Sequence, residues 1–421
     1  MFFVVSIIVI AVQAFALFLA LFEPTLRYKI SHPIDAPLDS DHYLRILTTL
    51  TGASACRNTI IRTLTNGEVF YEAELDAIRA ARRSITLEAY IFQKGRIARQ
   101  FIDALAGRAR AGVKVHVVLD AFGSFATGRR YFKNLLDAGG RVCWYHGFGW
   151  HTLPSLNHRT HRELLIVDGE IAFVGGAGIA DHWIYGARRQ PRWRDTMFCV
   201  EGEAAAGLQS SFVENWLEAT GELLTEDAYL CFAERQSSRP VLVVNSSPSS
   251  GASTRARILF QTLMASAART LHITTPYFLP DRGVRAEIIQ ALDRGVRVRI
   301  IAPGKTTDHL LTRRSSRRLY GDLLKAGAEI YEYQPSMLHT KSMIVDGAWC
   351  VVGTTNFDHR SFTINDEINL ATYDPILSER LNRDFLEDMS LSRQITYEEW
   401  CARPVYERFH EACGWLLERQ Q

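Results

Sequence analysis

Short apolar runs of strand length alternate with longer segments of helical periodicity along most of this chain. Between residues 85 and 145 the order is strand, helix, strand, helix, strand, and a hairpin pattern follows at 164–174. The strand-like segments are 85–92, 113–119 and 142–145, and the helical ones are 96–111 and 129–138. Strands that alternate with helices are typical of an α/β fold. We therefore predict a mixed β-sheet flanked by helices.

The same order of elements returns in the second half of the chain. Four blocks that begin at residues 84, 113, 135 and 161 resemble blocks that begin at 271, 296, 323 and 339, so the offsets are 187, 183, 188 and 178 residues. Four matches in one order indicate a duplicated domain. We predict two similar domains, at residues 65–230 and 250–421, joined near residues 225–255 and related by a pseudo-twofold axis.

The first 22 residues follow neither pattern. From Phe2 to Phe22 there is no charged residue, and a helix of about 21 residues extends roughly 30 Å, the thickness of a bilayer core. We predict an uncleaved, single-pass transmembrane anchor at residues 1–22 in the cell (inner) membrane, because the basic segment that opens a signal peptide is missing. Arg27 and Lys29 follow the apolar run, which favours a cytoplasmic location for the main body. Residues 23–64 are predicted to form a linker and entry segment.

The composition is that of a globular protein, with 47% hydrophobic and 22% charged residues. The net charge of +2 supplies no bulk attraction to nucleic acid, so we expect no nucleic-acid partner. The seven cysteines are scattered and form no C-x-x-C pair. This spacing argues against a disulfide framework and against a zinc site.

The candidate chemistry lies in two copies of one pattern, in which a histidine leads an apolar run that ends in Val-Asp-Gly. The second copy contains His339, Lys341 and Asp346, and the first contains His161 and Asp168. Side chains two residues apart on a strand share a face, so His339 and Lys341 are expected to point the same way. A neutral imidazole can attack phosphorus, and a nearby ammonium neutralises the phosphoryl oxygens. The two aspartates either belong to this site or only shape the hairpin turn.

A histidine nucleophile needs its second ring nitrogen held by an acceptor. Glu367, 28 residues after the second histidine, is the first candidate, and Asp195, 34 residues after the first histidine, is its counterpart. Each acid is thus expected to serve the histidine of its own copy, and the alternative for each is a surface carboxylate. Thr354 and Asn356 are either hydrogen-bond donors to phosphate oxygens or ordinary loop residues.

With these residues in place, the chain resembles the phospholipase D superfamily and, within it, the bacterial cardiolipin synthases. The superfamily motif His-x-Lys-x-x-x-x-Asp with a downstream Gly-Ser/Thr-x-Asn is met by His339, Lys341, Asp346, Gly353, Thr354 and Asn356. Segment 365–367 resembles the superfamily's acidic segment, and segments 193–195 and 275–281 resemble synthase segments. The similarity covers roughly residues 65–415. It implies chemistry without a metal or another cofactor.

The first copy departs from the family pattern at two positions. Glu163 occupies the place of the motif lysine, and Gly178 stands where Asn356 stands in the second copy. A carboxylate beside an anionic phosphodiester is unfavourable by Coulomb's law. Either Arg162, Arg159 or another cation compensates, or Glu163 serves the incoming alcohol.

The resemblance implies a two-step phosphatidyl transfer. One histidine attacks the phosphate of a phospholipid to give a phosphohistidine, and the other protonates the departing alcohol and then deprotonates the incoming hydroxyl. For a cardiolipin synthase both lipids are phosphatidylglycerol, and glycerol leaves. Analogy with the family favours His161 as the nucleophile and His339 as the acid and base, although Lys341 beside His339 leaves the reverse assignment open. A phospholipid and a membrane are then the expected partners, and the oligomeric state is left open.

Two other functions fit parts of the pattern. A hydrolytic phospholipase D or nuclease would use the same histidines, but a nuclease would need a basic groove and has little use for an apolar N-terminus. A non-catalytic protein that binds anionic lipid fits the substitutions at positions 163 and 178. A further basic feature is a predicted helix that carries Arg313, Arg314, Arg317 and Arg318 on one side, which either attracts anionic headgroups or is an ordinary solvated face.

Overall fold

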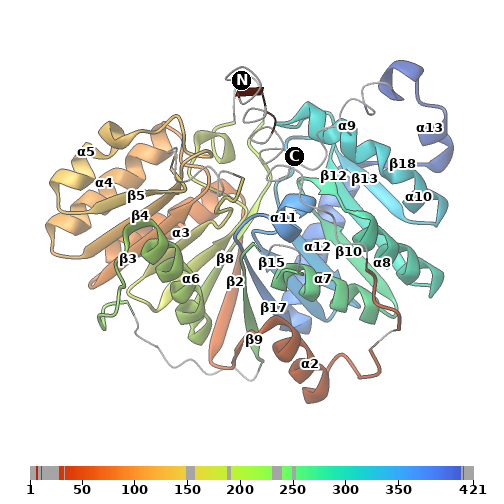
Figure 1. The fold of residues 1–421 in the computed structure, drawn as a ribbon, viewed down its shortest axis with the longest axis horizontal. Coiled ribbons are helices and arrows are strands. Elements are labelled where there is room, and N and C mark those ends of the chain that lie inside the picture. The colour runs from red at the N-terminus through yellow and green to blue at the C-terminus, as the bar shows by residue number, and fades with distance from the viewer. Residues whose placement is uncertain are drawn as a thin grey trace.

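The computed structural model describes residues 28–32, 34–147, 157–186, 191–229, 239–248 and 253–408, together with the isolated residues 6, 7, 11 and 411. Figure 1 shows two α/β halves side by side, the first in orange to yellow-green and the second in green to blue. Each half contains a mixed β-sheet that carries helices, as the alternation of apolar patterns predicts.

Seven strands form the sheet of the first domain, in the order β2-β8-β7-β6-β3-β4-β5. Strands β3, β4 and β5 run parallel to one another, and the other neighbours pair antiparallel. The strands are β2 (Thr59–Thr65), β3 (Ser84–Ala89), β4 (Lys114–Asp120), β5 (Arg141–Tyr145), β6 (Leu164–Val167), β7 (Ile171–Gly175) and β8 (Thr196–Gly202).

The sheet of the second domain repeats this order. Its central part reads β9-β17-β15-β14-β10-β12-β13, with β10, β12 and β13 parallel, and β1 and β18 extend its two edges. The duplication inferred from the four sequence blocks is therefore confirmed at the level of strand order. The strands are β1 (Ala55–Cys56), β9 (Val241–Ser246), β10 (Thr270–Thr274), β12 (Arg297–Pro303), β13 (Glu329–Tyr333), β14 (Ser342–Val345), β15 (Trp349–Gly353), β17 (Glu367–Tyr373) and β18 (Ser392–Ile395), with β11 (Phe278–Leu279) and β16 (Phe357–Asp358) in a small separate ladder.

Amphipathic helices cover the sheets. In α4, the buried residues Ile97, Phe101, Ile102 and Leu105 recur at helical spacing, so one stripe of the helix packs against the first sheet. The helices are α2 (Asp41–Thr51), α3 (Gly67–Ala80), α4 (Arg96–Arg110), α5 (Lys133–Asp137), α6 (Glu203–Thr220), α7 (Arg255–Ser266), α8 (Arg282–Asp293), α9 (Leu310–Arg318), α10 (Tyr320–Lys325), α11 (His359–Thr363), α12 (Pro375–Ser390) and α13 (Tyr397–Cys401), with 3-10 turns at Arg129–Phe132 and Asp181–Trp183.

Alternation along strand β6 shows how the two domains are joined. Leu165 and Val167 pack into the core that the first domain forms with α3 and α4. Leu164 and Ile166 point to the opposite face, as neighbouring residues of a strand do. There they enter a second buried cluster, which also contains Ile344 and other residues from the strands of the second domain. The two sheets thus share a hydrophobic core across the domain boundary.

Two strands, β2 and β9, extend the sheets beyond the predicted domain borders. Strand β2 belongs to the first sheet although it falls within the predicted linker, residues 23–64, and β9 belongs to the second sheet although it precedes residue 250. Strand β1, from the same predicted linker, pairs with β9. Strands β2 and β9 pair with β8 and β17, which lie more than 100 residues further along the chain. The local pattern of residues therefore did not identify them.

The predicted anchor at residues 1–22 lies outside the described residues, apart from residues 6, 7 and 11. Within the described part of the chain, every helix is too short or too polar to cross a bilayer. The transmembrane anchor stays a prediction from the sequence.

Candidate active site

The two predicted histidines lie where the domains meet, each in an extended segment that precedes the hairpin of its own domain. The segment before β6 pairs with the second domain through a parallel bridge between Thr160 and Asp366, and the His161 amide donates to the Asp366 carbonyl at 2.9 Å. The segment before β14 makes the reciprocal bridge between Arg194 and Leu338. The register of the sheets makes these two bridges equivalent. Such reciprocity is the property of a pseudo-twofold interface.

The backbone bridges bring each histidine beside the acid of the other domain. The Nδ1 atom of His161 lies 2.9 Å from Oε1 of Glu367, and Nδ1 of His339 lies 2.9 Å from Oδ2 of Asp195. The expectation that each acid serves the histidine of its own copy is therefore wrong. Each acid contacts Nδ1 of a histidine, but the histidine belongs to the other domain. The reason is that each acid directly follows the residue that forms the backbone bridge to the histidine segment of the other domain.

Both acids are buried and held in place. The Asp195 carboxylate accepts hydrogen bonds from the Trp183 indole at 3.0 Å and from its neighbouring backbone amide at 2.8 Å. Burial alone would raise the pKa of Asp195, but the hydrogen bond and charge of His339 and the charge of Lys341 lower that pKa below its ordinary value. An ionised carboxylate can hold Nδ1–H of the imidazole and leave Nε2 for chemistry.

Thr354 supports the second acid. Its hydroxyl donates to Oε2 of Glu367 and is fully buried. This contact assigns Thr354 to positioning the acid, in place of the predicted contact with phosphate. Asn356 differs, because it lines the cavity described below, and its buried Oδ1 has no hydrogen-bond partner among the described residues. Of the two predicted phosphate ligands, Asn356 is the one that can reach a substrate.

Lys341 provides a buried positive charge beside His339. Its ammonium lies 3.1 Å from Nδ1 of His339 and donates to the His339 carbonyl at 2.9 Å. Burial lowers the pKa of Lys341, and the charges of Asp195, Glu367 and Glu163 oppose that shift. Tyr277 lines the same cavity as His161, and its ring centroid lies 6.4 Å from that of His339, so the two pairs border a single site.

The histidines differ in their access to solvent. Burial, and then the charge of Lys341, lower the pKa of His339, while Asp195 opposes that shift. The side chain of His339 is 5% exposed, and that of His161 is 13% exposed. His161 therefore has the more open ring, whereas His339 is an enclosed group that gives up a proton readily.

The substituted motif position is occupied by a buried carboxyl. Glu163 accepts a hydrogen bond from the Ile91 amide at 3.0 Å. Burial raises the pKa of Glu163 well above its ordinary value, although Lys341 opposes the shift. The group thus favours its neutral acid form, which removes the Coulomb conflict with an anionic substrate.

The two departures from the motif are structurally linked. A Cβ atom added at Gly178 would lie 2.7 Å from Oε1 of Glu163 and 2.5 Å from the Ile91 carbonyl oxygen. The carboxyl therefore fills the space that a side chain at position 178 would need. Arg162, one of the proposed compensating cations, points away from the site, with Nη1 donating to the Ser211 carbonyl at 2.7 Å.

The two hairpin aspartates are not brought to the histidines. Asp168 and Asp346 adopt positive φ angles of 56° and 54° in the turns that follow β6 and β14. The Asp168 carboxylate accepts hydrogen bonds from the backbone amides of Arg82, Arg83 and Ser84. Since His161 precedes β6 and Asp168 follows it, the strand separates them by roughly 20 Å at about 3.3 Å per residue. The catalytic assignment of both aspartates is corrected to shaping the turn.

A cavity of about 450 Å³ opens in front of His161 and is built by both domains. The sequence reasoning named Arg159 only as a possible compensating cation and missed Arg360, since neither belongs to the motif. The spacing of Arg159, two residues before His161 on the same face of an extended segment, is the signal that identifies it. The first domain contributes Tyr90, Arg159 and His161 to the lining, and the second contributes Tyr277, Asn356 and Arg360.

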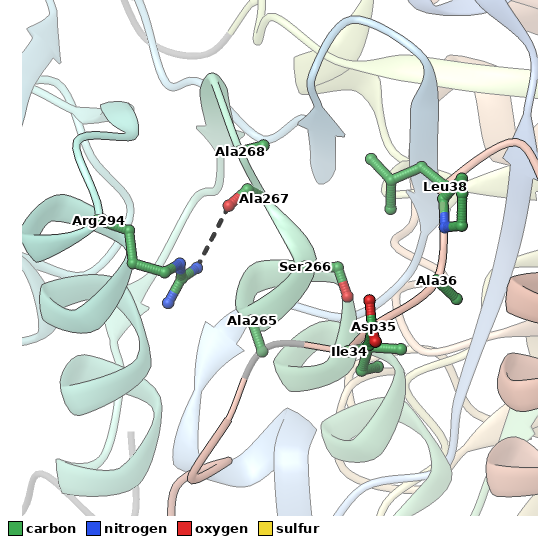
Figure 2. Close-up of a pocket in the computed structure, with 10 residues that line it drawn as sticks. Ile34, Asp35, Ala36, Leu38, Ala265, Ser266, Ala267, Ala268 and Arg294 are labelled. Atoms are coloured by element: carbon green, nitrogen blue, oxygen red, sulfur yellow. Dashed lines mark hydrogen bonds between the residues drawn. The ribbon is translucent and has the colours of Figure 1, made fainter.

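A second cavity, of about 540 Å³, lies beside the segment Ile34–Leu38 and the end of α7. Figure 2 shows the Arg294 guanidinium directed at the Ala267 carbonyl, to which it donates at 3.3 Å. Among the described residues that line this cavity, Arg294 is the one basic residue, and it also donates to the Met264 carbonyl at 3.0 Å. None of these described residues is a histidine, and the Arg294 side chain closes the end of a helix.

The four arginines on α9 do not all face solvent. Arg313 and Arg317 turn inward to the buried carboxylate of Glu332, at 2.9 and 3.3 Å. Arg314 and Arg318 are exposed. The predicted basic face is therefore halved, because a buried carboxylate in β13 takes up the charge of two of the four arginines.

Comparison with known proteins gives a consistent result. A family model described as the cardiolipin synthase, PLD-like domain matches residues 75–187 and 260–389. Cardiolipin synthase 1 of Bacillus anthracis is 32% identical over 396 residues, which are 92% of this chain and 77% of that protein. The major cardiolipin synthase ClsA of Bacillus subtilis is 31% identical over 385 residues, 91% of this chain and 80% of that protein.

A solved structure extends the comparison to the fold. The crystal structure of phosphatidylserine synthase from Haemophilus influenzae Rd KW20 superimposes with a TM-score of 0.66 at 14% identity, over 90% of this chain and 97% of that one. The duplicated α/β architecture is thus shared beyond close relatives. The two matched PLD-like domains and the identity over most of the length show that the chain belongs to the cardiolipin synthase family.

Proposed function

We propose that this protein is a phosphatidyltransferase that makes cardiolipin from phosphatidylglycerol through a phosphohistidine intermediate. The observation that carries the proposal is the exchanged pairing of His161 with Glu367 and of His339 with Asp195, in which each imidazole is oriented by an acid of the other domain and a buried ammonium lies beside His339. The names of the relatives support the substrate class. Two imidazoles in one site can serve as a nucleophile and as an acid and base in the same reaction.

In the first step, Nε2 of His161 attacks the phosphorus of phosphatidylglycerol. Glu367 holds the Nδ1–H of the attacking ring and stabilises the positive charge that develops on it. Lys341 and Asn356 stabilise the phosphoryl oxygens. The bond to the glycerol headgroup breaks as the phosphorus–nitrogen bond forms, and His339 gives its Nε2 proton to the departing glycerol oxygen.

In the second step, the hydroxyl of a second phosphatidylglycerol gives its proton to His339 and attacks the phosphohistidine. The phosphorus–nitrogen bond breaks, and the electron pair returns to His161. The products are cardiolipin, free His161 and protonated His339, so the enzyme is restored without an added cofactor.

The assignment of His161 as the nucleophile rests on access to the cavity. His161 lines the cavity in front of the site, whereas His339 is more enclosed and its lowered pKa makes it a stronger acid. Denaturation of the enzyme during turnover with labelled phosphatidylglycerol tests the assignment. The label is expected on the peptide that contains His161, and label on the His339 peptide would reverse the roles.

The mouth of the cavity offers a surface for contact with a bilayer. Phe122, which lines the cavity, is 60% exposed, and Phe125 in the same loop is 75% exposed. Leu310 and Leu311 at the start of α9 add exposed apolar surface from the second domain. The acyl chains of a lipid whose phosphate occupies the cavity would leave through this apolar rim. A membrane protein with an anchor at residues 1–22 and its catalytic domains at the cytoplasmic surface of the cell membrane would meet its substrate there.

The proposed function is tested with membranes that contain the overproduced protein and vesicles of phosphatidylglycerol. Cardiolipin and free glycerol are expected in equal amounts. Phosphatidic acid as the sole lipid product would replace the transferase assignment with hydrolysis. Lipid binding without turnover would identify a non-catalytic protein.

A further inference from the structure

The two copies of the motif place their cation on opposite sides of the histidine. In the first copy, Thr160 and Arg162 face the buried carboxylate Glu88 and its surroundings, so the alternate residues Arg159, His161 and Glu163 share the face that borders the site. In the second copy the same face carries Met337, His339 and Lys341. The cation follows the histidine in the second copy and precedes it in the first.

The cation of the first copy therefore lies at the cavity, whereas the cation of the second copy lies beside its own histidine. Lys341 contacts the His339 carbonyl, whereas Arg159 lines the cavity in front of His161, and both side chains are 4% exposed. Two residues along an extended strand advance roughly 6.6 Å. The backbone positions of Arg159 and His161 are therefore about this far apart on one face of the segment.

A second arginine, from the other domain, lines the same cavity. Arg360 lies in α11, and its guanidinium donates to Oδ1 of Asn157 at 2.7 Å and to the Asn157 carbonyl at 2.8 Å. Arg159 donates through Nη1 to the His146 carbonyl at 3.1 Å. Backbone and amide oxygens thus hold both guanidinium groups at the wall of this cavity.

Two buried carboxyls, Asp358 in the cavity lining and Asp120 behind it, act on this charge, and burial raises the pKa of both. Asp358 caps α11 by accepting from the Ser361 amide at 2.8 Å, and burial raises its pKa to about 6. Burial lowers the pKa of Arg360, to which the charge of Arg159 adds, while Tyr90 and Asp358 oppose the shift. Two guanidinium groups that face one partly enclosed space favour an anion between them, and phosphate oxygens are their usual partner.

We propose that Arg159 and Arg360 bind the phosphodiester of the acceptor phosphatidylglycerol, while Lys341 serves the phosphate that reacts at the histidines. The proposal rests on the proposed function, since cardiolipin carries two phosphodiesters on one glycerol. The inner part of the site then holds one phosphate, and the cavity holds the other. The ligand class is an anionic glycerophospholipid with a free headgroup hydroxyl.

The subsite explains why a lipid alcohol would compete with water for the phosphohistidine. Anchoring the acceptor through its phosphate holds its glycerol hydroxyl between Arg159 and His161, where His339 can take the proton. The headgroup of a bound lipid also displaces water from the cavity. Positioning of this kind raises the effective concentration of one nucleophile over another.

The test measures how one intermediate is partitioned between two acceptors. The enzyme is supplied with phosphatidylglycerol vesicles and 1-butanol, so that cardiolipin and phosphatidylbutanol form from the same phosphohistidine. In Arg159→Gln and in Arg360→Gln, the ratio of cardiolipin to phosphatidylbutanol is expected to fall at least tenfold. Arg159→Lys, which keeps the charge, is expected to recover part of the ratio. Arg314→Gln on α9 is the matched control, because this arginine is exposed and does not line the cavity.

Two outcomes overturn the subsite. An unchanged ratio with lower formation of both products would place the arginines at the reacting phosphate, as replacements for the missing lysine. An unchanged ratio and rate in Arg159→Gln would remove that arginine from the reaction. A parent enzyme that forms phosphatidylbutanol but no cardiolipin would contradict the proposed function instead, so the two failures are distinct. Arg360 also holds the loop at Asn157, so the Arg360→Gln variant could fail to fold. In that case the result for Arg159→Gln alone decides between the outcomes.

Discussion

The two half-sites of this protein share their histidine–acid geometry and differ in their charge. The half around His339 has the motif lysine and asparagine, while the half around His161 has Glu163 and Gly178 in those places. Both histidines nevertheless hold an acid at 2.9 Å. Each imidazole ring therefore needs its own orienting acid, because one ring transfers the phosphoryl group and the other transfers protons. One buried ammonium is enough for one phosphorus, and a second would have to be desolvated at a considerable cost.

Replacing either histidine is expected to give the largest loss of activity. His161→Asn and His339→Asn are each expected to lower kcat/KM for cardiolipin formation about 1,000-fold or more, and the double variant is expected to be little worse, because the residues act as a unit. A phosphatidyl ester of 4-nitrophenol separates their roles, since nitrophenolate leaves without a proton. This substrate is expected to restore release of nitrophenol in His339→Asn but not in His161→Asn. Rescue of the His161 variant instead would exchange the two roles.

The exchanged acids give the next largest effect. Glu367→Gln and Asp195→Asn are each expected to lower kcat about 100-fold, because the wrong ring tautomer or orientation is then favoured. The nitrophenyl ester is expected to rescue Asp195→Asn, which affects the acid His339, and to leave Glu367→Gln slow. Pairing within each copy predicts the opposite pattern of rescue.

The pH profile checks the same pairing independently. Burial and the charge of Lys341 lower the pKa of His339, and Asp195 raises it. Asp195→Asn removes the raising contribution, so the pKa of His339 falls further. Because the first step needs protonated His339, the alkaline limb of kcat/KM is expected to move to lower pH in this variant. An alkaline limb that stays in place would show that His339 is not the acid.

Position 163, where the first half-site has glutamate in place of lysine, tests the difference between the two half-sites through the free energy of unfolding. Glu163→Lys would place a second ammonium beside Lys341 in a buried space, and it is expected to cost about 3–5 kcal/mol in the free energy of unfolding. The alternative interpretation, a weakened motif position, predicts equal or higher activity in this variant. Glu163→Gln keeps the shape and neutrality of the protonated acid and is expected to fold and turn over like the parent. Thermal unfolding and cardiolipin formation measure both variants.

Glu163 also gives the stability a pH dependence of known sign. Burial raises its pKa in the folded protein above the value of about 4.3 for an unfolded chain. The folded state therefore holds a proton that the unfolded state releases. The stability from this group is full below the unfolded pKa and is lost as the pH rises through the folded pKa. Glu163→Gln is expected to flatten that slope in denaturant unfolding measured across pH, and an unchanged slope would assign it to other groups.

The smallest kinetic effect is expected at the hairpin turns, which are alike in both halves. Asp168→Asn and Asp346→Asn keep a residue that tolerates the positive φ angle but weaken the hydrogen bonds to three backbone amides. Each is expected to cost about 1–2 kcal/mol in the free energy of unfolding. The kcat of the folded fraction should stay close to that of the parent. A loss of kcat comparable to that of the histidine variants would return these aspartates to the active site.

Much of the fold could be read from local patterns. The helical spacing at 96–111 and the apolar run at 113–119 correspond to α4 and β4, and the Asp-Gly pairs form the turns that close both hairpins. These elements are fixed by neighbours close in the chain, so the sequence contains the information directly. Strands β2 and β9 were placed outside the domains, because their pairing depends on distant partners.

The sequence by itself determined that the chain is a duplicated α/β protein with two histidines, a lysine and two acids suited to phosphoryl chemistry. It also revealed the asymmetry at positions 163 and 178. Only the tertiary structure decided which acid holds which histidine, that Thr354 supports Glu367, and that Arg159 and Arg360 meet in one cavity. Spacing along a chain specifies contacts within a domain, whereas the packing of two sheets about a pseudo-twofold axis joins residues more than 140 positions apart, such as His161 and Glu367, which are separated by 206.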